Sequence, residues 1–155
     1  MVKFYLLFLF ILCLYFSIGD LINRTIDNEF VLVLIALQFS FAFIEGDIFL
    51  LSFLIQLSIG MVFYSLSWFG AGDSKYSAVL SLSLPVELLP NALLLTMLTG
   101  GVVSVFCLLL NIARRIKFNV YGGVDDSQYN AGIPYGVAIS VGFYVMIFSH
   151  WVNYI

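Results

Sequence analysis

Charged side chains, histidine and cysteine are all scarce in this chain, and each scarcity excludes a class of protein. Only 10% of the residues are charged, whereas a soluble domain averages about a quarter, so a soluble enzyme is excluded. The six basic residues form no tract that could bind nucleic acid. The one histidine and the two cysteines, Cys13 and Cys107, form no C-x-x-C pair and no cluster. We therefore expect no metal, no disulfide and no other cofactor.

Apolar residues are abundant instead and make up 63% of the chain, with aromatic residues at 17%. This composition is typical of an integral membrane protein, whose helices face lipid and one another. The length of 155 residues allows one membrane-embedded domain, 1–155, and leaves no room for a fused soluble module. Membrane lipids are therefore expected partners.

Six apolar stretches predict an all-α, polytopic protein with six transmembrane helices. The predicted spans cover about 2–19, 30–44, 48–69, 76–89, 91–112 and 133–151. The fourth and fifth spans come from one long apolar run, which Pro85 and Pro90 interrupt. A polar loop, 113–132, follows the fifth span. In the sixth span, Pro134 suits the first helical turn.

The spacing of small residues suggests how the sixth span packs. Gly132, Gly136 and Ser140 recur at every fourth position, which places them on one face of a helix. Small residues on one face let a neighbouring helix approach closely in the bilayer. We therefore expect this face to lie against another span.

The basic residues predict the orientation of the chain. Five of the six fall in the segments after spans one, three and five, and only Lys3 lies on the other side; the five are Arg24, Lys75, Arg114, Arg115 and Lys117. By the positive-inside rule these segments are cytoplasmic, so both termini are expected on the outer side, with Trp151 and Tyr154 as an aromatic anchor there. Lys3 and Ser17-Ile18-Gly19 also fit a cleaved signal peptide, an interpretation we reject because it would remove a paired span.

Two aspartates stand where predicted spans meet polar segments on the predicted cytoplasmic side. Asp20 ends the first span, and Asp73 follows the third in Gly70-Ala71-Gly72-Asp73. Two carboxyl groups that share a site do not both ionise easily, so one keeps its proton. Such a pair can activate a water for attack on a peptide carbonyl. The glycines allow a sharp turn or a close backbone approach next to Asp73.

Three segments of the sequence together resemble a known family. They are Asp20 with Ile26 and Asn28, then Gly70-Ala71-Gly72-Asp73-Ser74-Lys75, and then Ile133-Pro134-Tyr135-Gly136-Val137-Ala138-Ile139. In this order, and with six spans, they are similar to the small prepilin peptidases of the Flp/Tad type. The resemblance covers nearly the whole chain, although each segment alone is a weak signal.

The resemblance implies an aspartic endopeptidase of the bacterial inner membrane that removes the leader from prepilins or pseudopilins on the cytoplasmic side. Asp20 and Asp73 match the catalytic pair of the family. The expected site-shaping residues are Gly70, Gly72, Asn28 and Lys75. For Lys75, an alternative role as an anchor in the lipid headgroups explains its position equally well. The zinc-binding segment of the larger bifunctional relatives is absent, so cleavage without methyltransferase activity is expected.

One departure and three alternatives stay open. The family usually has proline where this chain has Asp27, which adds an acid near the site. An archaeal preflagellin peptidase shares the acid motifs and the six spans. A small ion or proton transporter would use the same acids in a relay, and an inert assembly scaffold would not use them.

Overall fold

The computed structural model describes residues 1–22, 28–67, 70–121 and 134–153, and every regular element within these ranges is helical. The elements are α1 (Val2–Ile22), α2 (Asn28–Glu45), α3 (Leu50–Ser65), α4 (Ala71–Leu80), the 3-10 helices η1 (Ser81–Ser83) and η2 (Val86–Leu88), α5 (Leu89–Tyr121) and α6 (Tyr135–Val152). The prediction of an all-α protein is confirmed for the described residues.

Four stretches within the described residues are long and apolar enough to cross a membrane: α1, α2, Val86–Leu110 and α6. Helix α3 is apolar but shorter, at 16 residues, or about 24 Å at the usual rise. The prediction of a membrane protein is thus confirmed in its coarse form. The count of six crossings and the outward placement of both termini stay predictions.

The predicted fourth span, 76–89, is wrong in its boundaries. Helix α4 begins at Ala71, contains only 10 residues and is followed by η1. The Ser81 hydroxyl donates to the Ala78 carbonyl at 2.6 Å, and Pro85 has no N–H with which a helix could continue. The chain therefore turns after η1 and starts α5 at Leu89.

The predicted polar loop 113–132 is also wrong in part, because α5 continues through Tyr121. At 33 residues this helix is about 50 Å long, which exceeds a hydrocarbon core of about 30 Å. Residues 113–121 contain neither glycine nor proline, and Gly122-Gly123 come directly after them. Charge alone does not end a helix, since arginine and lysine are good helix formers.

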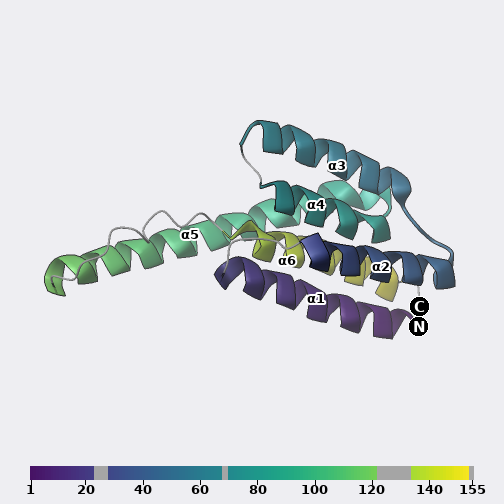
Figure 1. Cartoon of the computed structure of the whole chain (residues 1–155), viewed down its shortest axis with the longest axis horizontal. Helices are drawn as coiled ribbons and strands as arrows, with labels where there is room; N and C mark the ends of the chain where they lie inside the picture. Colours follow the sequence, from purple (N-terminus) through teal and green to yellow (C-terminus); the bar gives the residue numbers. More distant parts are fainter. Residues whose placement is uncertain (23–27, 68–69, 122–133, 154–155) are drawn as a thin grey trace.

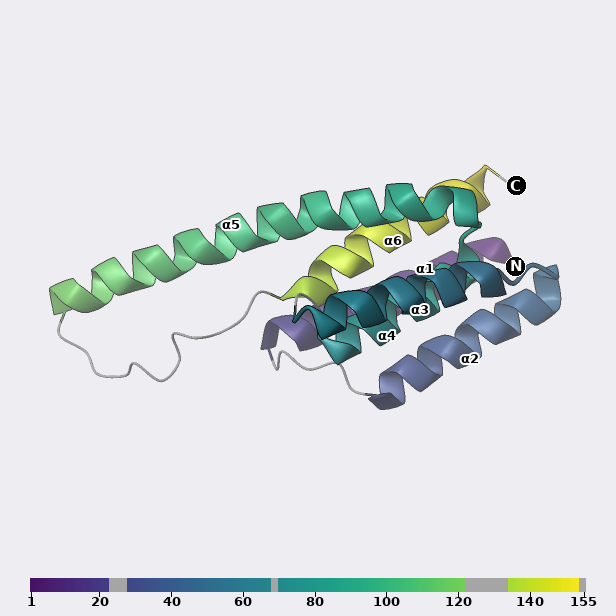
Figure 2. The same ribbon diagram turned by 90° about the horizontal axis from the view of Figure 1, so that it is seen from above.

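The helices lie side by side, with the two termini at the same end of the bundle (Figure 1). The C-terminal end of α1 and the N-terminal ends of α2, α4 and α6 are at the opposite end, which we call the site end. The second half of α5 projects beyond the site end in both views (Figure 2). Residues far apart in sequence, at the ends of α1 and the starts of α4 and α6, are thereby neighbours.

Helix α3 turns a polar face toward α4, and this contact positions the start of α4. Ser52, Gln56 and Gly60, spaced four residues apart, are all buried. The Gln56 side chain donates to Ser77 Oγ at 3.2 Å, and Ser74 Oγ donates to the Gly60 carbonyl at 3.0 Å. A Cβ on Gly60 would lie only 2.9 Å from Ser74 Cβ. Apolar side chains face outward, as expected in lipid.

The end of the bundle opposite the site is fastened by a second polar cluster. Tyr5 donates to Gln38 at 2.8 Å, and the Trp151 indole donates to the Ser83 carbonyl at 3.1 Å. Trp151 is only 1% exposed. The prediction of an interfacial anchor is therefore wrong for Trp151, because its N–H finds a buried acceptor. Tyr154 lies outside the described residues.

Gly142 offers a test of the contact between α5 and α6. A Cβ at this position would lie 2.7 Å from the Thr96 backbone nitrogen and 2.9 Å from Thr96 Cα. Backbone atoms cannot move aside as a flexible side chain can, so Gly142→Ala should destabilise the fold by about 1–3 kcal/mol. Denaturant unfolding in detergent micelles measures this. Gly101→Ala is the matched control, because a Cβ there meets nothing within 4 Å, and equal stability of the two variants would contradict the packing.

Candidate active site

The Gly-Ala-Gly-Asp segment forms the N-terminus of α4. Gly70 precedes the first helical residue in an extended conformation, and Asp73 lies in the first turn. The Gly70 N–H donates to Asp73 Oδ2 at 3.3 Å, the side-chain to backbone half of a capping interaction. A Cβ on Gly70 would lie 3.0 Å from the same oxygen, so a larger residue would crowd the carboxyl group. Gly72 lies between Gly70 and Asp73 in the first turn of α4 and is half-buried.

Asp20 lies in the last turn of α1, because the helix continues to Ile22 rather than ending at residue 19. Its side chain is buried, with 7% of its surface exposed. One carboxylate oxygen accepts the N–H of Gly136, at 2.6 Å, from the first turn of α6. Helix α6 thus contacts α1 through an acid at the site end.

The two acids are coupled electrostatically. Burial, and after it the negative charge of Asp20, raise the pKa of Asp73 from its ordinary value of 3.8 to about 6, although the Gly70 hydrogen bond lowers it. A like charge acts in this way only when it is near. Asp20 and Asp73, which the sequence predicted on one side of the membrane, therefore lie close enough in the structure for the charge of one to act on the other.

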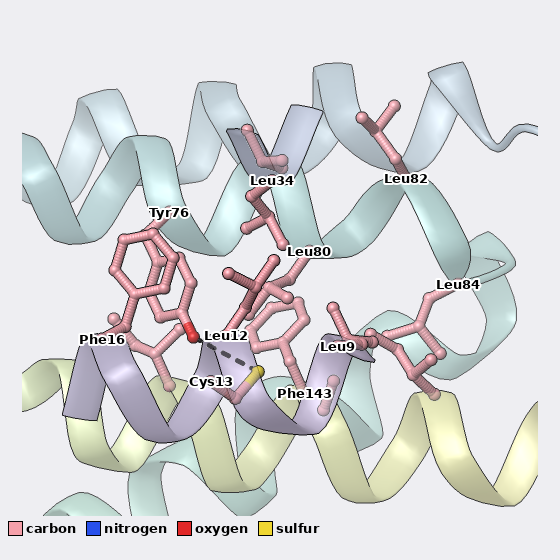
Figure 3. Packing of buried hydrophobic residues seen from close by; sticks show 14 of the residues in the cluster. Leu9, Leu12, Cys13, Phe16, Leu34, Tyr76, Leu80, Leu82, Leu84 and Phe143 are labelled. Carbon is pink, nitrogen blue, oxygen red and sulfur yellow. Dashed lines mark hydrogen bonds between the residues drawn. The ribbon is translucent and has the colours of Figure 1, made fainter. Parts of the chain in front are cut away.

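A layer of aromatic and polar side chains lies one helical turn from this pair, on the side away from the site end (Figure 1). Tyr76 is fully buried and stacks on Phe16 with 4.4 Å between the ring centroids. Its hydroxyl is 2.8 Å from Ser140 Oγ and donates to the Cys13 sulfur at 3.4 Å (Figure 3). Ser140 also donates to the Gly136 carbonyl at 2.7 Å. This layer ties α1, α4 and α6 together one turn away from the acids.

Asn28 and Lys75 contact one another at the edge of the site. The Lys75 ammonium donates to Asn28 Oδ1 at 3.2 Å, joining the start of α2 to the start of α4. Residues 23–27, which connect α1 to Asn28, lie outside the described residues. Asp27 and Arg24 belong to the same undescribed stretch. The roles of Asn28 and Lys75 in the reaction stay predictions.

Sequence reasoning did not assign Tyr76, Cys13 or Phe16 to the site. The helical period contained a usable signal, since Tyr76 is three residues after Asp73, and Phe16 and Cys13 are four and seven before Asp20. Gly136 and Ser140 were predicted only as a packing face, and both do pack on α1. Gly132, the third member of that stripe, lies outside the described residues.

Within the described residues, no three histidine, cysteine or acidic side chains lie close enough together to hold a metal ion. Both cysteines are free thiols. The groups that the site presents are therefore two carboxyls, one of them with a raised pKa, and the backbone N–H groups beside them. Such a set can polarise a water and protonate an oxygen.

These features define a helical membrane protein with two neighbouring acids at the ends of its helices, the buried Asp20 and the half-buried Asp73. The sequence model of the type IV leader peptidase family matches residues 7–105, a range that includes both aspartates. The chain therefore belongs to the type IV leader peptidase family and is a peptidase-type membrane protein. Neither the comparison with curated proteins nor that with solved structures gives a match. The family match ends within α5, so Gly136 and α6 lie outside it.

The coupling of the two acids predicts a bell-shaped dependence of kcat/KM on pH. Since the pKa of Asp73 is raised to about 6, its carboxyl keeps a proton at pH values where an ordinary aspartate has lost it. Activity should fall about tenfold per pH unit above the upper apparent pKa, as both acids ionise, and again at low pH, as both become protonated. Initial rates with a leader peptide across pH 3–9 measure this. A rate that stays constant through the upper range would contradict it.

Proposed function

We propose that this protein is an aspartic endopeptidase that removes the N-terminal leader of prepilins or pseudopilins at the cytoplasmic face of a bacterial inner membrane. The observation that supports it best is the buried Asp20 beside an Asp73 whose pKa is raised to about 6 by burial and by that neighbour. Such a pair can hold one proton between two carboxyls, which is what hydrolysis by an activated water requires. Family membership makes peptide bonds the expected substrate.

Both acids lie at helix ends, and this position favours a substrate whose cleavage point is at the membrane boundary. Asp20 is in the last turn of a candidate span, and Asp73 is in the first turn of α4. A leader that is polar, joined to an apolar helix in the bilayer, would present its cleavage point at this level. Lys75 lies at the site end, and Lys3 lies in the first turn of α1, so the excess of bases in the site-end segments favours a cytoplasmic site.

The experiment is to co-express this chain with candidate prepilins and to measure the mass of the pilin. We expect a loss that corresponds to the leader, with no added methyl group on the new N-terminus. Asp73→Asn is the control, and it should leave the precursor intact. Cleavage of archaeal preflagellin but of no prepilin would favour the archaeal alternative. Proton flux in liposomes that requires Asp73, without any cleavage, would replace the proposal with a transporter.

A further inference from the structure

The Asp20 side chain is hydrogen-bonded to helix α6, which lies outside the residues that the family model matches. Helix α6 begins at Tyr135, after Pro134, and no side chain of its own caps its first turn. The first N–H groups of a helix have no partner within the helix, so an acceptor from elsewhere satisfies them. Here the acceptor is the Asp20 carboxyl of α1, which takes the Gly136 N–H at 2.6 Å. An N–H bonded to a carboxylate at this distance favours its ionised form, as does the positive end of a helix.

Only glycine fits at this position. A Cβ on residue 136 would lie 2.8 Å from Asp20 Oδ2, 3.0 Å from its Cβ and 3.1 Å from its Cγ. All three atoms belong to the same buried side chain, so the carboxyl would have to move and the hydrogen bond would lengthen or break. By contrast, a Cβ on Gly19, the neighbour of Asp20, would meet nothing within 4 Å.

Of the two carboxyl groups, that of Asp73 accepts the longer and weaker hydrogen bond. The Gly70 N–H is 3.3 Å from its Oδ2, beyond the usual N–H···O distance, and the pKa of Asp73 is raised to about 6 although this bond opposes the rise. The two carboxyls thus differ in their surroundings. Both accept an N–H at the start of a helix, but the hydrogen bond is 2.6 Å long for Asp20 and 3.3 Å long for Asp73, and the negative charge of Asp20 raises the pKa of Asp73.

We propose that Gly136 is a positioning residue that holds Asp20 as the ionised carboxylate, so that Asp20 acts as general base and Asp73 as general acid. This inference rests on the proposed function. Asp20 takes a proton from water as the water oxygen bonds to the peptide carbon, and Asp73 gives its proton to the carbonyl oxygen. Asp20 then returns its proton to the leaving nitrogen as the C–N bond breaks, and Asp73 recovers a proton from the hydroxyl that becomes the carboxyl of the product.

Other titratable groups on the packed helices do not replace this pair. The Lys75 ammonium is bonded to Asn28, and the Tyr76 hydroxyl to Ser140 and Cys13. Among the described residues, the titratable side chains nearest the site end of the helices packed around Asp20 are Asp73, Lys75, Tyr76, Glu29 and Tyr135. Asp73 is the one of these whose pKa is shifted by the charge of Asp20.

Gly136→Ala tests the inference in the full-length protein, with the pH profile of cleavage as the readout. We expect kcat to fall at least tenfold, with little change in KM, and the acidic limb of the profile to move up by about one pH unit, because the ionised base has lost its charge-assisted donor. Gly19→Ala should leave both limbs and the rate unchanged. Gly142→Ala should be less stable but should keep both limbs, because Thr96 and not an acid lies against it. An acidic limb of Gly136→Ala at the wild-type position would overturn the inference.

Infrared spectroscopy of the carboxyl stretch tests the same assignment without any substrate. A protonated carboxyl band should be present in the wild type, where it titrates near pH 6, and in Asp20→Asn, where it titrates at a lower pH, and it should be absent in Asp73→Asn. Its persistence in Asp73→Asn would overturn the inference. Because this measurement needs no cleavage, it separates a failure of the acid assignment from a failure of the proposed function, which the co-expression experiment reports.

Discussion

Asp20→Asn and Asp73→Asn are each expected to lower the rate of leader removal by about three orders of magnitude, while the protein still inserts and folds. Asparagine has the size of aspartate but can neither ionise nor exchange a proton, so either change removes one half of the acid–base pair. The two losses should not add in the double variant, because a single proton-sharing unit is lost each time. Cleavage of a purified prepilin in detergent, followed by mass spectrometry, measures the rates.

Glu87→Gln is the matched control, since it makes the same acid-to-amide change at an exposed position in the turn before α5. We expect its rate to equal that of the wild type within a factor of two. Full processing by either aspartate variant would exclude the two-aspartate mechanism, whatever the family match.

Tyr76→Ala should cause the largest loss of stability among the substitutions considered, about 3–5 kcal/mol. The ring is fully buried, stacks on Phe16 and lies between α1 and α6, so truncation leaves a cavity and strips Ser140 of a partner. Asp73 is three residues before Tyr76 and Asp20 is four residues after Phe16, so this layer lies one helical turn from both acids. Unfolding in mixed micelles measures the change in free energy.

Tyr76→Phe separates packing from hydrogen bonding at the same position. The phenylalanine ring preserves the stack on Phe16 and removes only the hydroxyl, so we expect a loss of about 1 kcal/mol. A comparable truncation at Tyr144, which is less buried, should also cost less. If Tyr76→Ala were no less stable than Tyr144→Ala, the layer would not support the site.

The helices and their order could be predicted from the sequence because lipid imposes one strong rule on it. Long apolar runs must be helical in the bilayer, and the polar breaks at Glu45-Gly46-Asp47 and Gly70-Ala71-Gly72-Asp73 interrupt them. For that reason α1, α2 and α6 begin and end within a few residues of prediction. The prediction that Asp20 and Asp73 lie on one side of the membrane came from counting the predicted spans, and the structure places both at the site end of the bundle (Figure 1).

The length of α5, the burial of Trp151 and the contact between α6 and Asp20 could not be predicted from the spacing of apolar residues. Helix α5 continues past the apolar run, because a polar helix and a polar loop have similar composition when glycine and proline are absent. Trp151 is buried because Ser83, far away in sequence, supplies an acceptor. Likewise, the hydrogen bond between Gly136 and Asp20 joins residues 116 positions apart, and no local pattern specifies it.

The effect of Asp20 on the titration of Asp73 is the most direct test that the two acids share a site. The measurement is the midpoint of the infrared carboxyl band in the wild type and in Asp20→Asn, over the same pH range. We predict a midpoint near pH 6 in the wild type and a lower one in Asp20→Asn, because removing the negative charge of Asp20 lets Asp73 ionise more easily. The same midpoint in both proteins would mean that the two carboxyls do not interact, and would contradict the account.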